Sequence, residues 1–276
     1  MKAIALGEVE ALLQELFIAA EGSGLRREDR KKAVELTAML AELQRAGRRG
    51  LLVDAAAGKA YLGVLAAALL DVTRVVVIER EPGRADACRQ AAARAKVEAR
   101  VDVRVGDVGD ASLWPDRPDV VAALHACGAA SDLVLDAAVR AESRWLFLVP
   151  CCYAAAVPFS PAAEALGESL GLPRHAEPRR RFVTALIDAE RTLRLEAAGY
   201  ETTVVPFVPP TVTPHNLLWR ARRAREPGRM RDAAERLARL RGFTSSSSAS
   251  PSPSAPSSSP SGSDPTSPSA SRPPRP

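Results

Sequence analysis

A turn of small residues in the first quarter of the chain holds the residues with the clearest chemical potential. The apolar run 51–53 ends at Asp54, and the turn after it leads directly into a helical pattern. Small side chains let a ligand approach the backbone, and the amino end of the next helix attracts polar or anionic groups. Glu79 ends a second apolar run, where a carboxylate can accept hydrogen bonds from ribose hydroxyls. This layout predicts a nucleotide-type ligand site. The expected contacts are Asp54, which can accept hydrogen bonds from the loop amides or from the ligand, and Ala56, Gly58 and Lys59 of the turn.

Two further candidates follow the third predicted strand, 101–105. Asp107 is placed to meet the exocyclic amine of an adenine ring, and Val108 stands beside it. An acid after a strand is often only a helix cap or a solvated loop residue. Here, however, acids follow three consecutive strands on one edge of the expected sheet. Of the glycines that mark a dinucleotide-binding turn, only Gly58 is present. That departure favours S-adenosylmethionine, which has the same adenosine end, over NAD.

Residues that can move protons or act as nucleophiles follow the fourth and fifth apolar runs. His125 ends the fourth run, where four roles are open: general base, hydrogen-bond donor to substrate, wall of the cofactor pocket, or buried histidine bound to backbone. Cys151, Cys152 and Tyr153 follow the fifth run. We predict His125, Cys151 and Tyr153 as catalytic residues, and His125 also as a cofactor contact.

The same imidazole and thiol groups allow two other interpretations. His125, Cys127, Cys151 and Cys152 lie at neighbouring strand ends and could converge on zinc, but there is no Cys-x-x-Cys pair. A cysteine activated by His125 could instead act as the nucleophile of covalent base methylation. We favour close packing beside the reaction centre, with reduced thiols and no bound metal.

An arginine-rich segment, 174–182, is predicted as a loop on the carboxyl edge of the sheet. Its consecutive Arg179, Arg180 and Arg181 suit phosphate contacts and a substrate-recruiting role, although a solvated face explains them equally well. RNA is therefore the first substrate hypothesis, a protein side chain the second and a small metabolite the third.

An alternation of apolar runs and helical patterns predicts the parallel sheet that would bring these groups together. Two amphipathic helices, 9–20 and 27–46, precede it and should pack on the domain or cover the cofactor, and a basic amphipathic helix follows at 228–241. The strands are predicted at 51–54, 74–79, 101–105, 119–124, 145–149, 201–208 and 216–220. The helices among them are predicted at 59–70, 83–95, 129–141, 160–171 and 188–198.

Composition limits the class of protein further. The chain has 276 residues and a net charge of +5, and its basic residues are mostly arginine, which suits phosphate or carboxylate partners. From 244 onward it is almost entirely Ser, Pro, Ala and Thr, so we expect this tail to be disordered. No apolar run is long enough to span a bilayer and no secretory pattern is present, so we predict a soluble, cytoplasmic protein.

Three motifs resemble one branch of the class I methyltransferases, the methyltransferase-like 25 type, and more distantly a group of tRNA 2′-O-methyltransferases. They are the Leu-His-x-Cys-Gly motif at 124–128, the Pro-Cys-Cys motif at 150–152, and the turn after the first strand. That turn reads Asp-x-Gly-x-Gly-Lys-Gly in the family; here Asp54, Gly58 and Lys59 match, and alanines replace the glycines at 56 and 60. The segment 213–218 is also similar, and the resemblance covers roughly residues 30 to 222.

The resemblance implies an α/β, Rossmann-like class I methyltransferase fold, with a seven-stranded, mostly parallel sheet and an N-terminal helical extension. It also implies S-adenosylmethionine as cofactor and in-line attack by the acceptor on the methyl group, with His125 handling the proton. The expected segments are a helical extension at 1–48, the methyltransferase domain at 49–224, a basic helix at 225–243 and the disordered tail at 244–276. Two alternatives stay open: an NAD(P)-dependent oxidoreductase, and a non-catalytic nucleic-acid-binding or scaffold protein on a degenerate methyltransferase fold.

Overall fold

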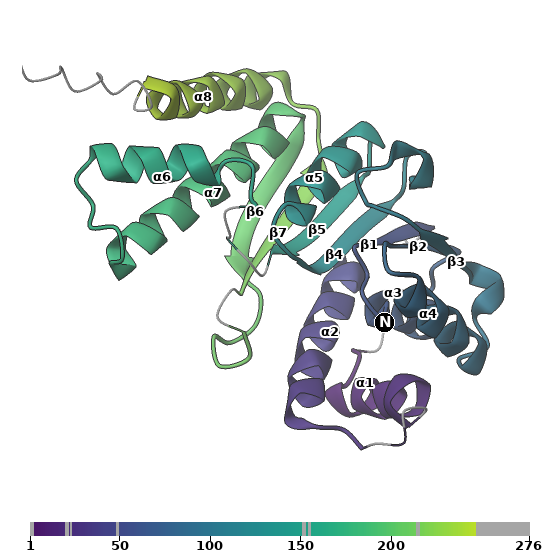
Figure 1. Ribbon diagram of the computed structural model, residues 1–276. Helices are drawn as coiled ribbons and strands as arrows, with labels where there is room; N and C mark the ends of the chain where they lie inside the picture. Colours follow the sequence, from purple (N-terminus) through teal and green to yellow (C-terminus); the bar gives the residue numbers. More distant parts are fainter. Residues whose placement is uncertain are drawn as a thin grey trace, which may run out of the picture.

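One seven-stranded sheet organises the molecule (Figure 1). The computed structural model describes residues 3–19, 22, 24–47, 50–150, 153, 156–213 and 216–246. The strand order is β3-β2-β1-β4-β5-β7-β6, in which β1 to β5 are parallel and β7 is antiparallel to both of its neighbours. The predicted fold class is confirmed. The strands are β1 (Leu51–Ala55), β2 (Arg74–Glu79), β3 (Val101–Val105), β4 (Val120–Ala126), β5 (Trp145–Pro150), β6 (Tyr200–Pro206) and β7 (Leu217–Arg223).

Helices cover both faces of the sheet, which explains why its central strands are continuous apolar runs. In β2, Val75 and Val77 pack with the apolar sides of α1 to α4, whereas Val76 and Ile78 pack with α5. Figure 1 shows α1 to α4 towards the β3 end of the sheet and α6 to α8 towards the β6 end. The helices are α1 (Leu6–Leu13), continued by a π-helical turn (Gln14–Ile18), α2 (Arg27–Arg45), α3 (Tyr61–Leu69), α4 (Pro82–Arg94), α5 (Ala130–Arg140), α6 (Ser160–Ser169), α7 (Glu177–Ala197) and α8 (Pro227–Ser246). Single 3₁₀ turns lie at Glu98–Arg100 and Ala111–Leu113.

The order of the strands fixes where a ligand can bind. From β1 the chain first adds β2 and β3 on one side and then returns to place β4 on the other side. In such sheets ligands bind at the carboxyl ends of the strands, where the connections diverge. The ends of β1, β2 and β4 therefore form the expected crevice.

The largest differences from the predicted boundaries concern two helices. The helix predicted at 188–198 begins at Glu177, because Pro178 suits a first helical turn and Val183, Ile187 and Leu195 continue the buried stripe. The last helix continues to Ser246, so it includes the first residues of the predicted tail; the tail from 247 lies outside the described residues. Within the described part of the chain, no helix combines the length and the apolar character that crossing a membrane requires.

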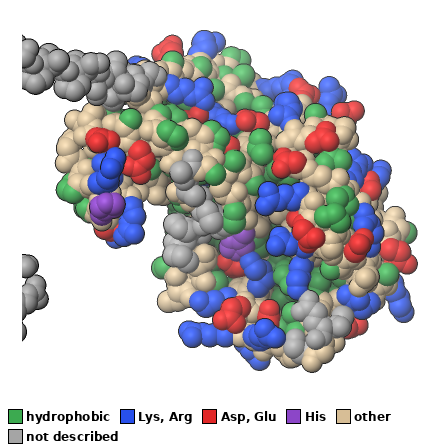
Figure 2. Space-filling model, viewed as in Figure 1, with side chains coloured by type: hydrophobic (Ala, Val, Ile, Leu, Met, Phe, Trp, Pro, Cys, Tyr) green, Lys and Arg blue, Asp and Glu red, His purple; other side chains and the backbone are tan. Residues whose placement is uncertain are grey.

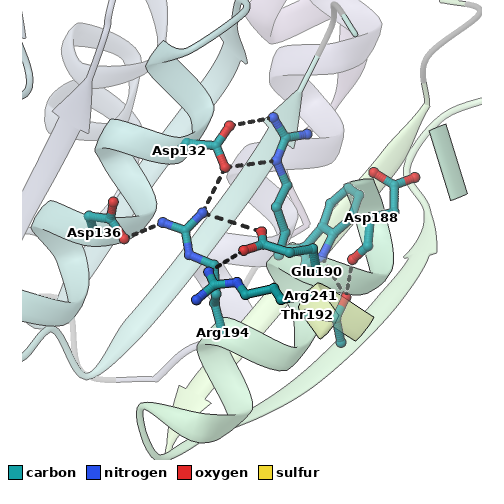
Figure 3. A network of polar contacts seen from close by, with 9 residues as sticks. Asp132, Asp136, Asp188, Glu190, Thr192, Arg194 and Arg241 are labelled. Atoms are coloured by element: carbon teal, nitrogen blue, oxygen red, sulfur yellow. Dashed lines mark hydrogen bonds and ion pairs between the residues drawn. The ribbon is translucent and has the colours of Figure 1, made fainter. Parts of the chain in front are cut away.

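A buried polar network ties α5, α7 and α8 together (Figure 3). Asp132 on α5 accepts a 2.8 Å hydrogen bond from Arg191 and a 2.9 Å hydrogen bond from Arg194, both on α7. Glu190, also on α7, pairs with Arg241 on α8. The Arg191 side chain is 0% exposed and Asp132 is nearly as buried, so each charge depends on the other for compensation.

Candidate functional site

The turn after β1 has an unusual backbone. Ala56, Gly58 and Ala60 have φ angles of +53°, +60° and +53°, and Ala60 is the residue immediately before α3. A left-handed conformation costs an L-residue about 1–2 kcal/mol, whereas glycine adopts it freely. Glycine at 56 and 60 would therefore adopt this backbone without that cost. The two alanines keep the turn in the same conformation at some cost in stability.

We predict that Ala56→Gly stabilises the protein by about 0.5–1 kcal/mol, because glycine removes the left-handed strain and only a partly buried methyl group is lost. Ala57→Gly is the matched control: its φ is not positive, so the same change should lower stability by about 0.5–1 kcal/mol. Urea unfolding of both variants measures the difference. Equal losses of stability in the two would contradict this account of the turn.

Asp54 lies at the end of β1 and is almost completely buried, with 1% of its surface exposed. Its Oδ2 accepts a 2.8 Å hydrogen bond from the backbone N–H of Gly63 in α3. Burial raises the pKa of Asp54 to about 7, and the negative charge of Glu79 acts in the same direction, against the hydrogen bond from Gly63. Asp54 thus fixes α3 to β1 and lines the crevice.

The raised pKa predicts a pH-dependent stability. Since the folded pKa exceeds the unfolded value, the folded protein binds more protons between about pH 4 and 7, and stability falls as the pH rises through this range. Asp54→Asn keeps an acceptor for Gly63 and removes the ionisation. Relative to the variant, the wild type should lose on the order of 4 kcal/mol between pH 4 and pH 8. Denaturant unfolding at both pH values measures this loss; parallel pH profiles of the two proteins would refute it.

Glu79, at the end of β2, is buried and orders the turn. Its Oε2 accepts a 2.7 Å hydrogen bond from Gly58 N–H, and its Oε1 accepts a 3.0 Å hydrogen bond from Glu81 N–H. Asp107, after β3, is exposed and accepts a 2.8 Å hydrogen bond from Gly109 N–H, while Val108 is buried. Glu79, Asp107 and Val108 line one cavity of about 590 Å³, so the structure brings these three predicted residues together.

His125 is aimed at this cavity by a β-bulge. The β4–β5 register shifts between Leu124 and Ala126, and His125 has a left-handed φ of +65°. Its Nε2 lies 2.8 Å from Oε1 of Glu35 on α2, and Lys32 Nζ lies 2.9 Å from the other oxygen of Glu35. Burial raises the pKa of Glu35, but the hydrogen bond with His125 and the Lys32 charge outweigh it, so the net shift is downward. Sequence reasoning missed Glu35, whose only signal was an acid beside the apolar stripe of its helix.

A second, smaller cavity adjoins the first. It has a volume of about 210 Å³ and is lined by Asp54, Gly58, Lys59 and Lys32, among others. Ala56, Arg84 and His125 line both cavities, so His125 stands at their junction. The larger cavity, with Glu79 and Asp107, matches the adenosine part of S-adenosylmethionine, and the smaller one, at the amino end of α3, matches its amino-acid part. The described residues therefore fit this cofactor.

Tyr153 lies in a different environment. Its hydroxyl donates a 2.8 Å hydrogen bond to Asp188 on α7, and Arg191 stands 5.5 Å above its ring. Burial raises the pKa of Asp188 to about 6 and raises that of Tyr153 as well. Tyr153 and Asp188 line a cavity of about 740 Å³ that also contains Arg180 and Arg181. Tyr153 is not among the residues that line the two cofactor cavities.

Three expectations about this edge need correction or fall outside the structure. The predicted loop carrying Arg179–Arg181 is the first turn of α7. Within it Arg179 is buried and bonded to Glu164 at 2.8 Å, and Arg180 and Arg181 pair with Glu177. Cys127 is disulfide-bonded rather than a reduced thiol, whereas Cys88 is free and buried. Cys151 and Cys152 lie outside the described residues.

Comparison with known proteins agrees with this geometry. Residues 30–157 match a family model described as a methyltransferase domain. A glutathione S-transferase C-terminal domain-containing protein homolog from Drosophila pseudoobscura pseudoobscura is 26% identical over 192 residues, which is 60% of this chain and 32% of that protein. The human glutathione S-transferase C-terminal domain-containing protein is 24% identical over 195 residues, which is 60% of this chain and 29% of that protein. The chain thus spans about a third of the length of the curated relatives it matches.

Among solved structures, a putative caffeoyl-CoA O-methyltransferase from Staphylococcus aureus is similar, with a TM-score of 0.47 and 13% identity over 77% of this chain and 91% of that one. The strand order, the pair of cavities and the family match all bear on the same part of the chain. The two cavities that fit S-adenosylmethionine thus lie within the part of the chain that matches the methyltransferase-domain model.

Proposed function

We propose that this protein transfers a methyl group from S-adenosylmethionine to an acceptor that enters beside His125. The observation that carries the proposal is the junction of the two cavities, where the histidine is held on a β-bulge by a buried carboxylate. When bound, the cofactor supplies a methyl group on a positively charged sulfur. The protein need only orient the two reactants and remove a proton.

We assign the following roles to the residues of the site. Glu79 and Asp107 hold the adenosine part through its hydroxyl and amine donors, and the 56–60 turn holds the amino-acid part through backbone groups. His125 accepts the acceptor's proton, and Glu35 fixes the ring and compensates the positive charge that the ring gains. We assign the acceptor side to Tyr153 and Asp188, which line a separate cavity of about 740 Å³.

RNA is the acceptor we propose first, and a protein side chain second. Support for RNA comes from Arg180 and Arg181, which line the same cavity as Tyr153 and remain largely exposed at the start of α7. Phosphate oxygens are preferred partners of guanidinium groups. We place the chain in the methyltransferase-like 25 branch on its sequence motifs. A cytoplasmic location stays a prediction.

The acceptor class can be found with a radiolabelled methyl donor. Full-length protein is incubated with methyl-tritiated S-adenosylmethionine and separate fractions of total RNA, protein and small molecules, with Glu79→Ala as the blank. We expect wild-type-dependent label in the RNA fraction. Label in protein alone would replace RNA with the second acceptor, and label in no fraction would oppose the activity.

Glu35→Gln should lower kcat by about 10- to 100-fold, because a neutral amide cannot compensate the charge that His125 gains. The affinity for S-adenosylhomocysteine should change by less than about threefold, since the loss concerns proton removal and not cofactor contacts. Glu28→Gln, at an exposed position in the same helix, is the control. Rates and calorimetric affinities of both variants decide the point: an unchanged kcat in Glu35→Gln would rule out a positioning role.

A further inference from the structure

Four arginines converge at the amino edge of the parallel sheet, on the opposite side from the cofactor crevice. Arg117 precedes β4 and Arg144 precedes β5. Arg223 is the last residue of the antiparallel β7, and Arg225 follows two residues later. Together with Glu142 they line a cavity of about 340 Å³. None of these residues lines the cofactor cavities.

The backbone holds these segments in a fixed arrangement. Arg117 N–H donates to Ala141 O at 2.9 Å, Arg144 N–H donates to Pro118 O at 3.0 Å, and Arg223 N–H donates to Arg144 O at 2.9 Å. Arg117, Glu142 and Arg225 all have left-handed φ angles, between +46° and +56°. Non-glycine residues seldom adopt this conformation, and it is concentrated at functional sites. Backbone hydrogen bonds therefore fix the relative positions of the segments that line the cavity.

The charges in this cavity do not balance. Glu142 is its one acid, and this carboxylate pairs with Arg117 at 3.1 Å and also with Arg223 and Arg225. The side chain of Arg144 makes no hydrogen bond or ion pair with any residue that the structure describes. The nearby carboxylate of Asp119 is engaged by Leu51 N–H at 2.9 Å, and Asp116 precedes Arg117 in the chain. The lining alone has four positive charges and one negative charge.

Over the face of the molecule in Figure 2, lysine and arginine side chains are interspersed with acidic ones. Four guanidinium groups around a single carboxylate differ from that pattern. Guanidinium groups bind phosphate oxygens through paired N–H donors, which makes phosphate the anion best matched to such a cluster.

We propose that the cavity formed by Arg117, Arg144, Arg223 and Arg225 is a phosphate-binding site, separate from the methyltransferase site. Its ligand is a phosphate group of a larger anion, either the backbone of an RNA chain or a free di- or polyphosphate. Arg144 supplies the donors that no described residue uses, and Arg117 and Arg225 can turn from Glu142 towards the ligand because both are largely exposed. The proposal does not depend on methyl transfer.

The test compares the full-length protein with Arg117→Asn/Arg144→Ser. Asparagine at 117 is chosen because it tolerates a left-handed backbone. The control, Arg231→Ser/Arg239→Ser, removes the same charge from exposed positions on α8. The probes are inorganic pyrophosphate, followed by calorimetry, and a fluorescein-labelled 12-nucleotide single-stranded RNA, followed by anisotropy. S-adenosylhomocysteine binding, measured in parallel, confirms that each variant is folded.

We expect the native protein to bind pyrophosphate and the 117/144 variant to bind it at least 10-fold more weakly, with less than a twofold change in the control. If RNA binding falls in the same variant and its salt dependence becomes shallower, the phosphate belongs to RNA. If only pyrophosphate binding falls, the ligand is a free phosphate compound. If neither probe binds more weakly to the 117/144 variant than to the control, the proposal is wrong.

Discussion

Glu79→Ala is expected to weaken S-adenosylhomocysteine binding by at least about 100-fold. The carboxylate holds Gly58 N–H at 2.7 Å and lines the larger cavity, so its removal affects both the turn and the adenosine contacts. Hydrogen bonds to a charged group contribute about 1.5–3 kcal/mol each. If the carboxylate accepts two from the adenosine part, their loss lowers the affinity by about 100-fold or more. Isothermal titration of the full-length variant measures the change.

Glu81→Ala is the matched control for Glu79→Ala. Glu81 is an acid two residues away whose side chain caps α4 by accepting hydrogen bonds from Gly83 N–H and Arg84 N–H. Its removal should lower the free energy of unfolding by about 1 kcal/mol and leave cofactor affinity within about threefold. Comparable affinity losses in the two variants would show that the effect is general destabilisation rather than a binding contact.

Asp132→Asn is expected to lower the free energy of unfolding by about 3–5 kcal/mol, which is the largest stability effect that the structure predicts. The substitution leaves the fully buried guanidinium of Arg191 without its carboxylate. Arg194 suffers less, because Asp136 and Glu190 also pair with it. Urea unfolding at pH 7 measures the change.

Asp136→Asn provides the comparison, because it removes a carboxylate from the same network at a half-exposed position. Exposed ion pairs contribute only about 0–1 kcal/mol, so this variant should remain close to wild type. The pair Asp132→Leu/Arg191→Met should recover much of the loss, since removing both charges leaves none uncompensated. Equal stability of Asp132→Asn and Asp136→Asn would contradict the importance of the buried pair.

The sequence allowed most of the sheet to be predicted, because each central strand is a continuous apolar run that ends at a polar residue. Asp54, Glu79 and Asp107 could be placed on one edge because each stands at or just after the end of a predicted parallel strand. The hydrogen-bond partners of these carboxylates were not predictable. The carboxylate of Asp54 accepts from a backbone amide of α3, and that of Glu79 accepts from a backbone amide of the turn. These hydrogen bonds depend on how the turn folds back over the strand ends.

The contacts of His125 and Arg179 were beyond sequence reasoning. Glu35 and His125 are ninety positions apart, and only the bulge in β4 turns the imidazole towards α2. From the sequence, Arg179 is expected to be a surface residue in a charged run. In the structure the helix begins before Arg179 and places it against α6, where Glu164 compensates its charge. Tertiary packing, which has no local signature, determines both.

The structure also bears on the two alternatives. Alanine at 56 and 60 suggested a degenerate turn, yet both residues keep the left-handed backbone that glycine would adopt there, and the cavities beside them remain open. The antiparallel β7 inserted between β5 and β6 closes the sheet in the way expected of a class I methyltransferase. These features favour the methyltransferase over the oxidoreductase and over the non-catalytic scaffold.

Calorimetric titration of the full-length protein with S-adenosylhomocysteine, and separately with NAD, tests the central claim most directly. The account predicts one site per chain with micromolar affinity for S-adenosylhomocysteine and no measurable heat with NAD. Tight binding of NAD, or no binding of S-adenosylhomocysteine to the folded protein, would contradict it.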